Sequence, residues 1–329
     1  MTTAAELQNA LNQAALNTGE YNFIVILAGT YSTVDNGGSP FTYSSTTTFG
    51  LYLIGGTGTG CPGDTHPRIL DGGAVSAVLD LHSIGGDITL ENLTIQNGIV
   101  PQVNPTGDEG AGLRINTAPG DGGGVSVFNC IIRDNHTYNA TSPFSGLLIE
   151  VRNNRYLNFD NNLVVGNTAI TDGAAGVIYA DNTISSSYVN IANNTVTNNT
   201  SQDSGAAGGM IFNGVNGGLF ADNIFRNNSN YGLVLNYPAL LLHNDYGTLG
   251  GTASPAPGSM GNVQVNARFV DAANGDYHLS AASPLIGLGR VSDLCCSGVD
   301  LDGHQLPHAG RLDLGAYQET IFGDGFDGD

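Results

Sequence analysis

The side chains best suited to acid–base and charge chemistry gather in one part of the chain. Five basic residues fall between positions 114 and 155, namely Arg114, Arg133, His136, Arg152 and Arg155. Glu150 and Asp160 lie in or beside the same span. A polysaccharide lyase needs a base for the proton next to a sugar carboxylate and a cation to offset that carboxylate. The candidate catalytic set is therefore Arg114, Glu150, Arg152, Arg155 and Asp160, although solvated or ion-paired arginines on a strand surface explain the same pattern.

Hydrolysis of a glycosidic bond asks for a different arrangement of acids. A glycoside hydrolase places two carboxylates across one cleft, roughly 5–9.5 Å apart. Sequence spacing does not select a pair, and most of the candidates fall in expected loops. The candidates are Asp134, Glu150, Asp160, Asp172, Asp181 and Asp203.

The segment DLDG at 300–303 has the alternating oxygen ligands and glycine turn of a calcium loop, and Asp313 follows it. Asp300, Asp302 and Asp313 are therefore candidate Ca²⁺ ligands. The twelfth position of such a loop, counted from Asp300, holds Arg311 instead of glutamate. The alternative is a pair of turns whose aspartates accept backbone amides.

A repeat positions these residues. VNIANNTVTNN (189–199) shares its frame with VSVFNCIIRDN (125–135) and LNFDNNLVVGN (157–167), and further copies lie around Asn92, Asp222 and His243. The spacing varies, from 37 residues between Asn92 and Asn129 to 21 between Asp222 and His243. Short strands with a variable period predict a β-helix, in which coils lengthen through their loops.

Asparagine recurs at the same offset in each copy. Because equivalent positions of neighbouring coils stack about 4.7–4.9 Å apart, these amides can hydrogen-bond one another and the turn backbone. The repeat therefore predicts an asparagine ladder, with solvated turn residues as the alternative. The ladder positions predicted are Asn92, Asn129, Asn161, Asn193 and Asp222.

A second motif, a glycine-led strand, precedes most copies: GLRIN, GLLIE, GVIYA, GMIFN and GLVLN. Alternation places Leu113/Ile115, Leu147/Ile149, Val177/Tyr179, Met210/Phe212 and Leu233/Leu235 inside, and Arg114, Leu148, Ile178, Ile211 and Val234 outside. The outer face then carries an apolar stripe beside a polar one. A partner or sugar chain could bind this stripe, but we favour a stripe covered by the protein's own loops. The residues assigned to substrate binding are Asn116, His136, Tyr179, Asn213 and Asn236.

The ends of the chain depart from the repeat. Residues 1–20 contain an amphipathic segment (3–18) expected to be a capping helix, residues 21–250 form the predicted β-helix, and residues 251–329 form an irregular C-terminal cap and tail. The fold class expected is a single-domain, right-handed, single-stranded parallel β-helix. The two terminal segments are expected to cap it, because an open solenoid needs both ends closed.

The C-terminal region carries a resemblance. Phe269-Val270-Asp271, Asp276-Tyr277-His278-Leu279, Ser283-Pro284-Leu285-Ile286, DLDG at 300–303 and RLDLGAY at 311–317 resemble the cap of bacterial secreted β-helices of the choice-of-anchor type, in the pectin-lyase-like superfamily. Gly287 and Gln318 depart from that pattern, where the family has Asp and Glu. The resemblance implies the β-helix fold and export, and it says little about activity.

Composition limits the partners. The chain has 329 residues, with nine arginines, no lysine and 29 acidic residues, for a net charge of −20 with histidine neutral. This charge disfavours nucleic acid and anionic membrane surfaces. No apolar run is long enough for a membrane span, and an exported protein would have lost its leader before this chain begins. Extracellular polysaccharide or a cell-surface glycan is the expected partner; the alternative is a non-catalytic surface or adhesion scaffold. We also expect Cys61 to pair with Cys295 or Cys296 in an oxidising compartment.

Overall fold

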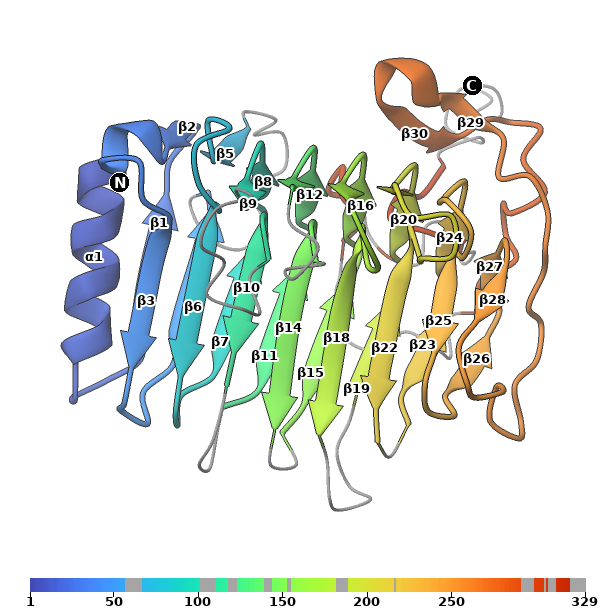
Figure 1. The fold of residues 1–329 in the computed structure, drawn as a ribbon, viewed down its shortest axis with the longest axis horizontal. Coiled ribbons are helices and arrows are strands. Elements are labelled where there is room, and N and C mark those ends of the chain that lie inside the picture. Colours follow the sequence, from blue (N-terminus) through green and yellow to red (C-terminus); the bar gives the residue numbers. More distant parts are fainter. Residues whose placement is uncertain are drawn as a thin grey trace, which may run out of the picture.

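The computed structural model describes residues 1–56, 67–100, 110–117, 123–138, 144–152, 155–181, 189–215, 217–290, 299–304, 306 and 312–319. The chain winds into a right-handed parallel β-helix of stacked coils (Figure 1). This confirms the expected fold class. The predicted disulfide involves Cys61, Cys295 and Cys296, which lie outside the described residues.

Three long parallel sheets run along the helix axis, and each coil contributes one strand to each. Sheet A contains β1 (Asn22–Ile26), β4 (Leu51–Gly55), β7 (Ile88–Glu91), β11 (Val125–Phe128), β15 (Leu157–Asp160), β19 (Val189–Ala192), β23 (Leu219–Ala221) and β26 (Leu240–Leu242). Sheet B contains β2 (Gly29–Ser32), β5 (Arg68–Asp71), β8 (Thr94–Gln96), β12 (Ile131–Arg133), β16 (Leu163–Val165), β20 (Thr195–Thr197), β24 (Ile224–Arg226) and β27 (Asp245–Tyr246).

Sheet C faces the viewer in Figure 1. It contains β3 (Phe41–Ser45), β6 (Leu79–Ser83), β10 (Leu113–Asn116), β14 (Leu147–Arg152), β18 (Gly176–Asp181), β22 (Met210–Gly214), β25 (Leu233–Leu235) and β28 (Leu249–Gly250). A short fourth sheet, D, lies between sheets B and C in four coils: β9 (Ile99–Val100), β13 (His136–Thr137), β17 (Thr168–Ala169) and β21 (Thr200–Ser201).

The inside of the helix is filled by aliphatic and aromatic side chains that stack coil on coil. Ile88, Val125 and Leu157 pair in register on sheet A and are all fully buried. Phe212, Phe220 and Phe225 meet in the same core, with the first two rings 5.1 Å apart and nearly perpendicular. Burial of such apolar area contributes about 25 cal/mol per Å². This continuous core fixes the register of every strand, and therefore the outward direction of the alternate residues.

Two asparagine ladders run inside the corners of the helix. In the corner between sheets A and B, each side-chain amide donates to the next: Asn162 to Asn194, Asn194 to Asn223, Asn223 to Asn244 and Asn244 to Asn262. In the corner after sheet B, the ladder runs through Asn135, Asn167, Asn199 and Asn228. The predicted ladder is therefore confirmed as a feature of the fold.

The ladder lies one residue later than predicted. Asn92, Asn129, Asn161, Asn193 and Asp222 occupy the corner residue just before it, and each has a left-handed backbone with φ between 50° and 57°. Asparagine and aspartate tolerate this conformation better than other side-chain-bearing residues. The pairs N-N or D-N in the repeat therefore divide the work: the first residue turns the chain and the second bonds along the axis.

The N-terminal end is closed by helix α1 (Ala4–Leu16). Thr3 caps it, since its side chain accepts from the Glu6 amide, and Ala4, Leu7, Leu11 and Ala14 are buried against the first coil. This agrees with the capping helix expected there.

The C-terminal segment folds back along the side of the helix. After a partial further coil, where Met260 bridges Leu242 and Val263 bridges Asp245, the hairpin of β29 (Phe269–Asp271) and β30 (Asp276–Leu279) lies beside the middle coils (Figure 1). Tyr277 packs with Leu163 and Val165 of β16. Of the segment predicted as a cap, the part up to Val263 thus extends the last coil, and the hairpin lies on the outside of sheet B.

Candidate functional site

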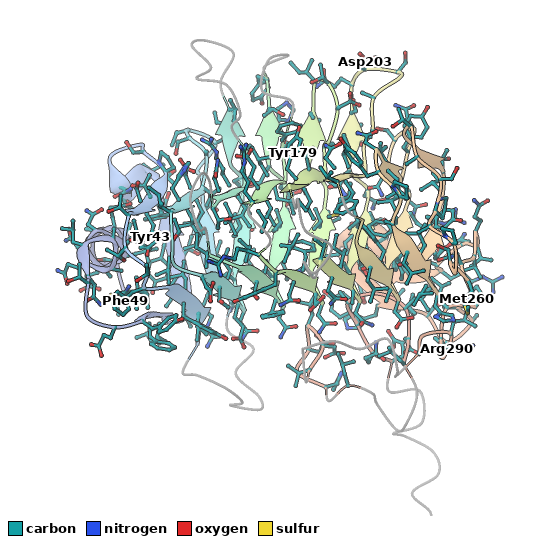
Figure 2. All side chains as sticks on the ribbon, turned by 90° about the horizontal axis from the view of Figure 1, so that it is seen from below. Tyr43, Phe49, Tyr179, Asp203, Met260 and Arg290 are labelled. Carbon is teal, nitrogen blue, oxygen red and sulfur yellow. The ribbon has the colours of Figure 1, made fainter. Side chains whose placement is uncertain are left out.

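The outer face of sheet C brings together most of the residues predicted to bind or act on a substrate. Arg114 and Asn116 project from β10, Glu150 and Arg152 from β14, Tyr179 from β18, and Asn213 from β22, with Asn236 just after β25. Figure 2, seen from below, shows Tyr179 on the side of the molecule that sheet C forms. The strands are in register, so these side chains form columns parallel to the helix axis.

One prediction of side-chain direction on this face was wrong. Ile178 and Ala180 lie in the core, whereas Val177 and Tyr179 point outward. Gly176 pairs with Leu147 and not with Gly146, so it takes an inward position that the other strands fill with a side chain. A Cβ at Gly176 would lie 2.5 Å from Leu147, which explains why glycine is needed there.

The apolar stripe of sheet C is covered by the protein's own segments. Leu148, Val177, Ile211 and Val234 stack in one column and pack against a set from the preceding loops, Phe144, Ala207 and Tyr231. We expected such a cover, and it removes this stripe as a binding surface.

Beside the stripe runs a polar column that occupies one position per coil. Its members are His82, Asn116, Glu150, Tyr179, Asn213 and Asn236. Coil spacing separates neighbours by about 4.8 Å. Asn236 donates to Asn213 at 2.7 Å, and Tyr179 makes an edge contact with Phe144. The column therefore aligns amide, carboxylate, imidazole and phenol groups, of which Asn116 and Glu150 are buried, and we call it the sheet C track.

Charged groups concentrate at the N-terminal half of this track. Glu150 is buried, accepts a short hydrogen bond from the Asn116 side-chain amide, and lies 3.3 Å from Nη2 of Arg152. Asp80 lies 2.8 Å from Nε2 of His82 and 4.0 Å from Nε of Arg114. Arg114 thus lies near Asp80, whereas Glu150 is paired with Arg152. An imidazole held by a carboxylate can transfer protons, and an arginine near that carboxylate can offset anionic charge.

Asp80 and His82 were not predicted from the sequence as site residues. They lie in LDLHS, one coil before GLRIN, where no leading glycine marks the strand. The signal was present in the alternation, because Leu79 and Leu81 point inward and leave Asp80 and His82 outside.

Three other predicted site residues lie elsewhere. Asp160 belongs to sheet A, and Arg155 lies in the connection that leads to that sheet. His136 belongs to sheet D, where its ring contacts Tyr138 with centroids 4.0 Å apart and burial lowers its pKa. None of these three belongs to the sheet C track.

Asp160 is a buried acid with a structural environment. Its Oδ1 accepts from the Asn190 amide at 2.8 Å and from the Ala192 backbone at 3.1 Å, and burial raises its pKa to about 8. Of the remaining acids, Arg133 pairs with Asp134 at the exposed end of β12, and Asp172 and Asp203 accept loop amides. The side chain of Asp181 lies outside the described residues.

The proposed calcium ligands bond the backbone of the C-terminal segment. Asp300 accepts from the amides of Asp302, His304 and Gln318, and Asp313 accepts from those of Gly287 and Glu319. Within the part of the chain that the structure describes, no three His, Cys, Asp or Glu side chains are grouped to hold a metal ion. The geometry favours the turn interpretation, and calcium at Asp300, Asp302 and Asp313 stays a prediction.

Asp302 makes its own contact, with His278. The ring of His278 is held between Asp276 at 2.7 Å and Asp302 at 2.6 Å and lies against Tyr317. The hydrogen bond with Asp302 is the largest of the effects that raise the pKa of His278 to about 9. Burial opposes it, and the hydrogen bond with Asp276 adds to it. The charged His278 therefore holds β30 to the turn at residue 300.

No protein-family model matches the chain, and no curated protein matches it at a significant level. Among the described residues, no helix has the length and apolar character to span a membrane. Cys130 is a free, buried thiol in the core. The class of protein that the structure defines is thus a parallel β-helix with internal asparagine ladders.

Proposed function

We propose that the sheet C track binds a chain of extracellular polysaccharide, laid parallel to the helix axis. The observation that carries this proposal is the column from His82 to Asn236, which offers one polar side chain per coil along a straight line. A linear glycan presents hydroxyl groups at a similarly regular interval. The covered apolar stripe beside the track supplies a rigid wall that keeps these side chains in position.

The charged half of the track supports a second proposal, cleavage of the bound glycan. His82 with Asp80 offers a base, Glu150 a second carboxylate, and Arg114 and Arg152 offer cations for a sugar carboxylate. In this proposal, lyase chemistry uses the imidazole and the arginines, whereas hydrolysis uses Asp80 and Glu150. The resemblance to secreted pectin-lyase-like proteins is in keeping with both proposals and with export to the cell surface.

A panel of neutral and acidic glycans tests the proposal. Retention of the protein on gels that carry each glycan should be measured with and without calcium. The same glycans should be assayed for unsaturated products and for new reducing ends. Retention that Asn213→Ala weakens, with products that Glu150→Gln abolishes, supports an enzyme. Retention without products supports a binding module. The matched control is Asn158→Ala, which removes a half-buried asparagine from the outer face of sheet A.

The outcome against the proposal is equally clear. If no glycan is retained, or if Asn158→Ala weakens retention as much as Asn213→Ala, sheet C is not the binding face. The rival function, a non-catalytic surface scaffold, then gains support. Calcium is tested separately: an increase in melting temperature with calcium that Asp302→Asn removes would support the predicted metal site.

A further inference from the structure

A second unusual surface lies on the outer face of sheet A, at the corner where each strand begins. Five successive coils place one residue each in this column: Tyr21, Gly50, Asp87, Gly124 and Tyr156. The backbone bonds Asn22–Gly50, Leu51–Asp87, Ile88–Gly124 and Val125–Tyr156 fix the order and register of the column. The arrangement is symmetric, with a carboxylate at the centre, a glycine on each side and a tyrosine at each end.

The two glycines make room for the two rings. A Cβ at Gly50 would lie 2.8 Å from a ring carbon of Tyr21, and a Cβ at Gly124 would lie 2.3 Å from a ring carbon of Tyr156. Both tyrosines therefore lie across the neighbouring coil and lean toward Asp87. Tyr21 remains 57% exposed in this position, so much of its ring faces solvent.

A second pair of aromatic rings extends the same surface. Phe23 and Tyr52 follow in the next outward column of sheet A and stack with centroids 5.5 Å apart and planes 23° apart. Phe23 is 68% exposed. The Tyr52 hydroxyl donates to Glu91 at 2.8 Å. We call this surface the tyrosine platform; it consists of Tyr21, Phe23, Tyr52, Asp87, Glu91 and Tyr156.

The platform carries two carboxylates, and each already accepts two hydrogen bonds. Asp87 accepts from the Gly124 amide at 2.7 Å and hydrogen-bonds Tyr156, while Glu91 accepts from Tyr52 and contacts the Asn92 amide at 3.4 Å. Burial, followed by interaction with Asp87, raises the pKa of Tyr156 to about 12, and burial, followed by the hydrogen bond to Glu91, raises that of Tyr52 to about 12. The rings therefore stay neutral and electron-rich beside two negative charges.

We propose that the tyrosine platform binds the head group of a small quaternary ammonium compound. Aromatic faces attract cations through their quadrupole, and quaternary ammonium groups are typical ligands of such surfaces. The carboxylates contribute negative charge at short range, while each already accepts two hydrogen bonds from the protein. A cation without N–H donors therefore fits better than a lysine ammonium or a neutral sugar. The net charge of −20 also favours a positively charged ligand.

Choline chloride is the probe for this proposal. The chain has 13 tyrosines and no tryptophan, so tyrosine emission and the methyl NMR signal of choline both report binding. Choline should bind with an affinity that falls as salt is added. The neutral isostere 3,3-dimethylbutan-1-ol, which has the same shape without the charge, should bind at least several-fold more weakly. Equal binding of the two ligands would overturn the proposal, as would binding of neither.

Variants locate the binding to the platform. Tyr21→Leu and Tyr156→Leu should each weaken choline binding roughly three- to thirty-fold, the range expected for one cation–aromatic contact. Asp87→Asn, which keeps the shape of the side chain, should weaken it several-fold. The matched control is Tyr237→Leu, since Tyr237 is another exposed tyrosine and should leave binding unchanged. Unchanged far-UV circular dichroism confirms that each variant is folded.

Two further results would overturn the proposal. Loss of binding in Tyr237→Leu to the same extent as in Tyr21→Leu would show that the site lies elsewhere. Tighter binding of tetralysine than of choline would assign the platform to a basic peptide. Asn213→Ala, on sheet C, should leave choline binding unaltered, which keeps this test separate from that of the proposed glycan site.

Discussion

Asparagine performs two different tasks in the two polar regions of this β-helix. In the corner between sheets A and B, Asn162, Asn194 and Asn223 are fully buried, and each amide is bonded above and below. On the outer face of sheet C, Asn213 is half-buried and bonds Asn236. Buried amides must be satisfied by the protein, whereas half-exposed ones can exchange water for a ligand. The first region therefore builds the coil stack, and the second is available for binding.

The largest effect on stability should come from removing one internal ladder residue. Asn194→Ala takes an acceptor from the Asn162 backbone and side-chain amides and a donor from Phe159 and Asn223. Several buried groups lose partners, so the free energy of unfolding should fall by about 3–5 kcal/mol. Urea denaturation measures this loss. A change below about 1 kcal/mol would show that the ladder is not a main source of stability.

The stability of the folded protein should depend on pH because of Asp160. The unfolded chain should lose this proton near the ordinary pKa of 3.8, whereas the folded protein holds it up to about 8. Stability from this group is therefore complete below about pH 4 and declines as pH rises toward 8. Asp160→Asn should be least different from wild type at pH 4 and more stable than wild type at pH 8, measured by thermal unfolding.

His278 changes stability in the same direction, because its pKa is raised to about 9 when folded. Its contribution is present below about pH 6.5 and is lost as pH rises through 9. It is shared by wild type and Asp160→Asn, so the difference between them isolates Asp160. Parallel stability curves for the two proteins would contradict the assignment of a raised pKa to Asp160.

The sequence predicted the coil stack better than the site, for a physical reason. Apolar alternation and repeated asparagines arise from the core and the corners, which every coil must satisfy in the same way. The division of each asparagine pair into a left-handed residue and a ladder residue needs the backbone, as Asn161 and Asn162 show.

The site depends on which coils differ. His82 and Asp80 were missed because their strand lacks the leading glycine, and Tyr179 was placed on the wrong face because Gly176 takes an inward position. Asp160 was grouped with Glu150 because the two are close in sequence. They lie on different sheets, since one corner of the coil separates them.

A smaller stability effect should distinguish the two neighbouring asparagines of one corner. Asn193 has φ of 54°, whereas Asn194 carries the ladder bonds. Asn193→Ala and Asn193→Gly both delete the side chain, but only alanine pays the left-handed strain. Glycine should therefore be more stable than alanine here by about 1 kcal/mol. At position 194 the glycine variant should not be the more stable one, and the two unfolding curves compared at each position measure this.

The smallest stability change should come from the sheet C track. Asn213→Ala removes the bond from Asn236 at a half-exposed position, where water replaces the lost partner. The free energy of unfolding should change by less than about 1 kcal/mol, in contrast to Asn194→Ala. Glycan retention should nevertheless fall, because the amide is offered to a ligand. A variant as unstable as Asn194→Ala would place Asn213 among the structural amides and remove the contrast between the two regions.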